Sequence, residues 1–228
     1  MLFNLLSGNL DLKSAITQVL AILMIVFLVL PFHEWAHAFT AMKLGDTSIQ
    51  YRGRLTLNPL AHVDPFGALA LLLFGFGWAK PVPVDPRNFK HPKLGMGIVA
   101  LMGPVANIVA AIVGGLIFHA VAAFAPDFFT GEGFGQYVYL FLLYYIQINV
   151  SLAVFNLLPI PPLDGSKILF IFLPDQAVAW FYRYQNIISM VLIALLWVGV
   201  LRIPLNFLTK YVLEFVNWIT ALPFSFVG

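Results

Sequence analysis

The chain of 228 residues contains no cysteine, which excludes a disulfide framework and any metal site built from thiolates. Charged residues are also scarce, because Asp, Glu, Lys and Arg make up only 10% of the sequence, whereas a typical soluble domain carries about 25%. Hydrophobic residues account for 61%. This composition cannot cover a water-facing surface, so it predicts an integral membrane protein in a lipid bilayer. The formal net charge of +2 gives no reason to expect a nucleic-acid partner.

Apolar runs predict the membrane-crossing helices, which we place at residues 15–44, 94–126, 133–163 and 184–201. Residues 65–79 form a shorter uncharged run interrupted by glycine, which is typical of a re-entrant or interfacial piece. The last stretch, 206–228, is apolar but contains Lys210 and Glu214. It is expected to be either a tilted span or an interfacial helix. Residues 1–12 lack the features of a removable signal peptide.

Positive charge predicts how these spans are oriented. Nine of the 12 Lys and Arg residues lie in the segments 43–93 and 164–183, which places both segments in the cytoplasm. The expected fold is an all-α polytopic membrane protein with about five to six transmembrane or re-entrant segments. No loop is long enough for a separate soluble domain. We therefore expect one domain over 1–228, with a core at about 15–173 and C-terminal helices at 184–225.

Residues 47–57 are the part of the cytoplasmic segment for which β-structure is expected. Polar and apolar side chains alternate crudely on both sides of Gly53, which predicts a short β-hairpin on the cytoplasmic side. An exposed strand edge there would suit pairing with an extended peptide. The alternative is a solvated loop whose basic residues lie near anionic headgroups.

A cluster of ionisable residues, His33-Glu34-Trp35-Ala36-His37, lies at the inner end of the first span. Ionisable groups at such a position are costly and usually functional. On a helix, this spacing places both imidazoles on one face, where they suit Zn²⁺ and leave Glu34 beside it as a base. The alternative is a coincidence, in which the histidines bind backbone or headgroups.

Two further motifs are predicted to lie in the inner part of the bilayer. Gly103-Pro104-Val105-Ala106-Asn107 places a neutral amide inside the second long span, although such residues also serve ordinary helix packing. The stretch from Asn156 to Gly165 contains three prolines and ends a span, with Asp164 close behind them. A plain turn leaving the membrane is the alternative for that stretch. A zinc site needs a third protein ligand, and Asp164 is the best-placed carboxylate outside the first motif.

The three motifs resemble those of the site-2 protease family of intramembrane metalloproteases, in its compact, mainly prokaryotic branch. The resemblance runs from His33 to Asp164 and takes in three further stretches, 53–59, 64–67 and 76–84. It implies zinc ligands at His33, His37 and Asp164 and a catalytic base at Glu34. It also implies that Asn107 and Asn156 position the substrate peptide or polarise its carbonyl. The chain has no room for the added soluble domain of the family's larger members.

The sequence therefore predicts a zinc-dependent intramembrane endopeptidase in the cell membrane, with its active site near the cytoplasmic side. The expected substrate is a transmembrane segment of a peptide or protein, and the oligomeric state is left open. Two other functions remain: a metal transporter, for which further ligands across the membrane would be expected, and an inactive relative that only holds membrane segments.

Four other candidate residues are interpreted as structural. His62 is expected to be a loop histidine rather than a partner of the metal site, and Asp64 is a weak rival to Asp164 because it has no partner motif. His119 lies near the outer end of its span, and His91 near lysines at the cytoplasmic surface.

Overall fold

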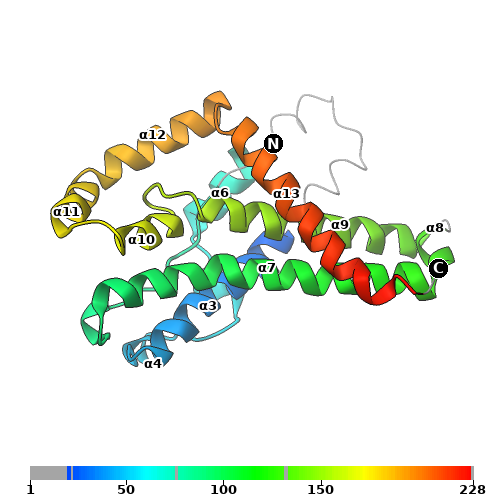
Figure 1. Ribbon diagram of the computed structural model, residues 1–228, viewed down its shortest axis with the longest axis horizontal. Coiled ribbons are helices and arrows are strands. Elements are labelled where there is room, and N and C mark those ends of the chain that lie inside the picture. The colour runs from blue at the N-terminus through cyan, green and yellow to red at the C-terminus, as the bar shows by residue number, and fades with distance from the viewer. Residues whose placement is uncertain (1–19, 22, 75–76, 131–132, 227–228) are drawn as a thin grey trace. The chain divides into compact units, whose positions relative to one another are not determined.

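The computed structural model describes residues 20–21, 23–74, 77–130 and 133–226 (Figure 1). The chain groups into two compact units, with the boundary in the sequence between Lys90 and His91. The expectation for residues 1–12 and the start of the first span fall outside the described residues. The expectation of a single domain over 1–228 stays a prediction.

The first unit is built around one helix, α3, which contains the ionisable cluster. Its elements are the π-helix η1 (Ile25–Val29), α3 (Leu30–Lys43), α4 (Ser48–Tyr51), α5 (Pro59–His62), α6 (Pro65–Phe74) and the 3-10 helix η2 (Pro86–Asn88). Helix α3 packs against η1, α4 and α5. The loops on either side of α5 therefore fold back toward the helix that holds His33 and His37.

The π-turn before α3 has a local cause in the sequence. Pro31 has no backbone N–H and its ring crowds the carbonyl four residues earlier, so the regular α-helical pattern is interrupted there. The N–H of Leu30 instead donates to the carbonyl of Ile25, five residues back. The extra residue shifts the helix register directly ahead of His33. Such π-turns are frequent at functional sites.

The second unit is a helical bundle. It comprises α7 (Pro92–Phe124), α8 (Pro126–Thr130), α9 (Phe134–Asn156), α10 (Asp164–Phe170), α11 (Asp175–Arg183), α12 (Gln185–Val198), α13 (Arg202–Ala221) and the 3-10 helix η3 (Leu222–Phe224). Helices α7 and α9 lie side by side, and α13 crosses and packs against both (Figure 1). Their shared core consists of Ala111, Val150, Val154 and Val216. Helix α10 packs against α7, where Gly97 leaves room for Ile171.

Among the described residues, three helices are long and apolar enough to cross a membrane: Ile25–Lys43, Pro92–Phe124 and Phe134–Asn156. A fourth span is possible if α11 and α12, which meet at a bend of 66°, act as one broken segment. The helical membrane fold is thus confirmed, whereas the expected five to six segments are not. Helix α7, at 33 residues, is about 50 Å long and exceeds the thickness of a bilayer core.

The β-hairpin expected at 47–57 is wrong. The described residues contain no strand, and their β-pairing consists of an isolated antiparallel bridge between Val63 and Ala79. Residues 48–51 instead form α4, because Asp46 Oδ1 accepts the N–H of Ser48 and starts a helical turn. Over one such turn Ile49 is fully buried while Tyr51 is 90% exposed, because residues two positions apart face nearly opposite sides of a helix, whereas they would share one face of a strand.

Candidate metal centre and active site

His33 and His37 lie one turn apart on α3 and face each other. Their Nε2 atoms are 3.0 Å apart, and the two rings meet edge to face with centroids separated by 4.6 Å. Both residues are buried. Two imidazoles that bind one tetrahedral zinc ion at about 2.05 Å hold their nitrogens about 3.3 Å apart, so this pair is close to the spacing that zinc requires.

The other side of α3 is lined by aromatic rings that fix the helix. Phe32 stacks on Trp35 with centroids 5.9 Å apart, and Trp35 stacks on Phe39 at 5.1 Å. The ammonium of Lys43 lies 5.4 Å from the centre of the Phe39 ring. Because these residues recur every three or four positions, they occupy one stripe of the helix and leave the histidine face to the polar site.

Glu34 is the neighbour of His33 and is itself 9% exposed. Its Oε2 accepts a hydrogen bond from the backbone N–H of Val82 at 3.2 Å. Sequence reasoning did not identify this partner, because a backbone amide has no residue type that a pattern could reveal. The stretch 76–84 was noted only as part of the family resemblance.

Val82 belongs to the segment 79–88, which is free of helix as far as Asp85 and ends in η2; we call it the strap. At its start, Ala79 pairs with Val63 and the N–H of Lys80 donates to the carbonyl of His62 at 2.7 Å. The His62 ring in turn contacts the carbonyl of Thr56 through Nε2, at 2.8 Å. His62 is fully buried in this loop structure.

Asp64 has a local structural function as well. Its Oδ1 accepts the N–H of Gly67 at 2.8 Å, in the first turn of α6. This hydrogen bond at the start of α6 gives the Asp64 side chain a structural role that requires no metal.

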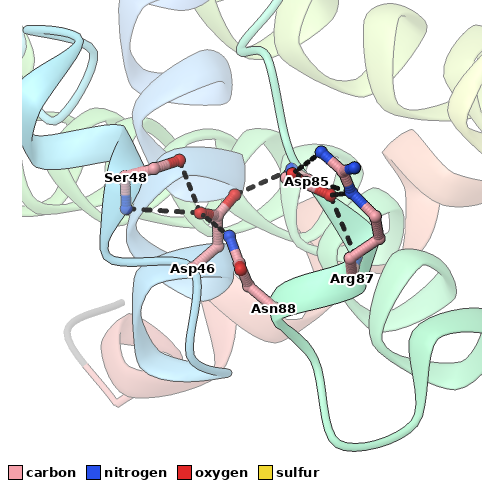
Figure 2. A network of polar contacts seen from close by, with 5 residues as sticks. All are labelled: Asp46, Ser48, Asp85, Arg87 and Asn88. Atoms are coloured by element: carbon pink, nitrogen blue, oxygen red, sulfur yellow. Dashed lines mark hydrogen bonds and ion pairs between the residues drawn. The ribbon is translucent and has the colours of Figure 1, made fainter.

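The far end of the strap is held by Asp46, which lies two residues after Leu44, the C-cap of α3 (Figure 2). Asp46 Oδ1 accepts from the hydroxyl of Ser48 at 2.6 Å and from the amide of Asn88 at 2.8 Å, and Oδ2 accepts from the N–H of Asp85 at 2.8 Å. Burial acts to raise the pKa of Asp46, but these hydrogen bonds together hold it below its ordinary value. Asp46 was not singled out from the sequence.

Asp85 also forms an ion pair with Arg87, with 2.7 Å between Oδ2 and the guanidinium (Figure 2). The hydrogen bonds from the Arg87 side chain and backbone lower the pKa of Asp85 to about 2. The same contact raises the pKa of Arg87. The pair is exposed to solvent, so its contribution to stability is small.

Asp164 is the first residue of α10 and is buried. The helix starts there because the preceding turn closes on itself: Ser166 donates through its hydroxyl to the carbonyl of Leu163 at 2.6 Å. Gly165 fits directly against the backbone of Leu157. The Nζ atom of Lys167 lies 3.4 Å from Asp164 Oδ1, and the Lys167 side chain is partly exposed. The Asp-Gly pair thus sets the carboxylate at a defined point of the turn.

The two asparagines expected to act on the substrate differ in their surroundings. Asn107 is fully buried on α7, next to Gly103 and Pro104, and α7 continues as one helix through that proline. Asn156 is the last residue of α9, and its amide donates to the carbonyl of Leu152 in the same helix at 3.0 Å. A third amide, Asn149, is buried on α9 and was missed, because an isolated Asn in an apolar helix carries no motif.

The first unit therefore brings together His33, Glu34 and His37 as the motif predicts. Asp164, Asn107 and Asn156 all lie in the second unit. Their assignment as third ligand, electrostatic stabiliser and substrate-positioning residue stays a prediction.

Comparison with known proteins finds that the chain is similar to peptidases. Residues 128–199 match the family model described as Peptidase family M50. Three relatives carry the printed name "Putative zinc metalloprotease": YwhC of Bacillus subtilis, Rip2 of Mycolicibacterium smegmatis and MJ0611 of Methanocaldococcus jannaschii. No solved structure matches significantly.

The similarity covers much of the chain. Identity to YwhC is 42% over 150 residues, which is 64% of this chain and 67% of YwhC. Identity to Rip2 is 36% over 142 residues, 58% of this chain and 49% of Rip2. For MJ0611 the identity is 32% over 142 residues, 60% of this chain and 63% of MJ0611. The match thus spans between one half and two thirds of the length of these relatives.

Proposed function

This chain belongs to peptidase family M50, the site-2 protease family of metalloproteases, and we propose that it is an intramembrane zinc endopeptidase. The observation that carries the proposal is the buried turn of α3 on which His33 and His37 face each other while Glu34 stands beside them. That turn lies on a helix long and apolar enough to cross a membrane. The substrate is a peptide bond within a transmembrane segment.

The proposed zinc ligands are His33, His37 and Asp164. Each is buried and offers one atom that can bind a metal. Two neutral imidazoles and one carboxylate give a formal charge of +1 with the ion, and three protein ligands leave one position for water, as in catalytic rather than structural zinc sites. When bound, zinc supplies Lewis acidity, which polarises a peptide carbonyl and makes a water nucleophilic near neutral pH.

Glu34 is the proposed general base and acid. Its carboxylate takes a proton from the attacking water and delivers it to the leaving amine when the peptide C–N bond breaks. The Val82 N–H holds one carboxylate oxygen in place during this exchange. The amide of Asn107 is proposed to donate to the developing oxyanion, and Asn156 to position the substrate.

We further propose that the protein is multi-pass and that its site lies near the cytoplasmic side, where water enters. The charge distribution in the sequence supports that orientation, since most basic residues lie in the segment between the first two spans and in the segment after the third. A helical substrate satisfies its backbone internally, so it has to unwind locally before its carbonyl is accessible.

The decisive experiment compares wild type with Glu34→Gln and Asp164→Ala in lipid vesicles that contain synthetic single-span peptides. Wild type is expected to cut a peptide and to lose this activity with a chelator. Glu34→Gln should retain zinc but not cleave, whereas Asp164→Ala should lose zinc. Cleavage by Glu34→Gln at the wild-type rate would refute the base assignment.

The same vesicles separate the two other functions. Zinc flux across the membrane that is lost in His37→Ala would indicate a transporter. Stoichiometric zinc without cleavage of any peptide in a broad set would indicate a protein that only holds membrane segments.

A further inference from the structure

The strap, residues 79–88, is held at both ends and contacts Glu34 in the middle. At one end the Ala79–Val63 bridge and the Lys80 N–H attach it to the loop around α5. At the centre the Val82 N–H donates to the Glu34 carboxylate. The strap is therefore the backbone that sets the direction of the proposed base.

The other end depends on a single carboxylate. Asp46 is fully buried and connects the turn after α3 to the strap, since Ser48 lies on one side of it and Asp85 and Asn88 on the other (Figure 2). Charge-assisted hydrogen bonds of this kind are roughly twice as strong as neutral ones. One buried anion thus joins the helix that holds Glu34 to the segment that contacts Glu34.

A second, independent feature marks the same junction. Gly45 has a φ of 119°, and a Cβ atom there would lie 2.7 Å from the carbonyl oxygen of Asn88. A side chain at position 45 would push the strap away and would also be strained in this backbone conformation. Asp46 and Gly45 therefore hold the strap through both hydrogen bonds and close packing.

We propose that Asp46 is a positioning residue for peptide-bond hydrolysis: it fixes the end of the strap, and through the strap it fixes the Val82 amide that orients Glu34. The proposal rests on the proposed function, because it takes Glu34 as the base. Groups that support metal sites and catalytic side chains in this way typically change activity 10–100-fold when they are removed, as an order of magnitude.

Two neighbours of Asp46 provide a matched pair of variants. Ser48→Ala and Asn88→Ala each remove one side-chain hydrogen bond to the same oxygen, Asp46 Oδ1, at 2.6 and 2.8 Å. Ser48 belongs to α4, whereas Asn88 belongs to the strap. If Asp46 acts through the strap, Asn88→Ala should affect catalysis and Ser48→Ala should not.

The experiment uses purified full-length protein in vesicles with a cleaved single-span peptide, and it measures kcat, KM and zinc content. Asp46→Asn and Asn88→Ala are expected to lower kcat about tenfold, with KM and zinc content unchanged, while Ser48→Ala behaves as wild type. Backbone hydrogen exchange at Val82 and Asp85 should rise in the first two variants. The swap Asp46→Asn with Asn88→Asp should restore part of kcat.

Equal losses of kcat in all three single variants, or zinc loss in step with activity, would show a merely structural role and overturn the proposal. Unchanged hydrogen exchange at Val82 in Asn88→Ala would overturn it whichever peptide is cut. The proposed function fails separately, if wild type does not cleave or if Glu34→Gln does. If wild type cleaves and Asn88→Ala has the same kcat as wild type, only the proposed role of Asp46 is rejected.

Discussion

Gly165 lies so close to Leu157 that a Cβ atom on it would come within 2.2 Å of the Leu157 carbonyl oxygen. The neighbouring carbonyl, that of Leu158, would be only 2.5 Å away. Both are backbone atoms and cannot rotate out of the way. The conformation that holds Asp164 therefore exists only with glycine at the next position.

Gly165→Ala is expected to displace the turn and with it Asp164, so that purified protein binds less than one tenth of the wild-type zinc, as an order of magnitude for a disturbed ligand. Metal analysis of purified protein measures this directly. Gly97→Ala is the control, because its Cβ would meet the flexible end of the Ile171 side chain, at 2.1 Å from Cδ1, and that side chain can rotate. Full zinc content in Gly165→Ala would contradict the ligand assignment.

Chelation should reveal the same ligand set through stability. A metal that binds the folded state raises the melting temperature, and removing it lowers that temperature again. Wild type is expected to melt at a lower temperature with excess chelator, while His37→Ala and Asp164→Ala should show no further decrease. If chelator lowers the melting temperature of Asp164→Ala as much as that of wild type, Asp164 is not a ligand.

The Asp46 junction should be sensitive to acid. Burial acts to raise the pKa of Asp46, but its hydrogen bonds together lower the pKa by a larger amount. The folded-state pKa is therefore below the ordinary value of 3.8. Such a carboxylate stabilises the fold above its unfolded pKa, and the stabilisation is lost as the pH falls through the folded pKa. The pKa of Asp85 is lowered as well, to about 2.

Thermal unfolding of wild type and Asp46→Asn across pH is the measurement. The difference in melting temperature between them should be constant from about pH 5 to 7 and should shrink below about pH 4. Asp127→Asn, at an exposed position of α8 in the other unit, is the control. A difference that grows on acidification would contradict the lowered pKa.

Helix α13 is expected to contribute to the stability of the bundle. Val216 is 1% exposed and packs in the core shared with α7 and α9, whereas Trp218, two residues later, is 58% exposed. Packing rather than water exclusion drives helix association in lipid. Val216→Ala should lower the free energy of unfolding by about 1 kcal/mol, and Trp218→Ala should change it little. Denaturant titration in detergent compares the two.

The sequence sufficed for the helical membrane fold and for the histidine pair, because both depend on local spacing. An uncharged run of sufficient length has few alternatives in a chain with 10% charged residues, and the i, i+4 separation of His33 and His37 determines a shared face once the helix exists. His62 contacts the Thr56 carbonyl through its ring and the Lys80 N–H through its own carbonyl, and its interpretation as a structural residue stays a prediction.

Residues 47–57 show why the hairpin prediction failed. The expected alternation was crude, and in a strand Ile49 and Tyr51 would share one face, whereas in the helical turn Ile49 is buried and Tyr51 is exposed. The backbone N–H of Ser48 instead donates to Asp46 Oδ1, a local turn contact of the kind that Asp favours. The partners Asp85 and Asn88 are 39 and 42 positions away, and no local pattern predicts them. The expected five to six transmembrane or re-entrant segments stay unconfirmed, since three helices of the described residues, or four with the bent pair, are long and apolar enough to cross a membrane.

The backbone donors of the strap have a consequence for how a peptide reaches the site. From Lys80 to Asp85, Pro81 and Pro83 have no N–H, and each remaining N–H has an internal acceptor: the carbonyls of His62 and Val82 and the carboxylates of Glu34 and Asp46. A polypeptide lying alongside residues 80–85 therefore meets no unpaired backbone N–H there. This segment is thereby protected from pairing with a strand of another chain, and hydrogen bonds to the backbone of a bound peptide have to come from other donors.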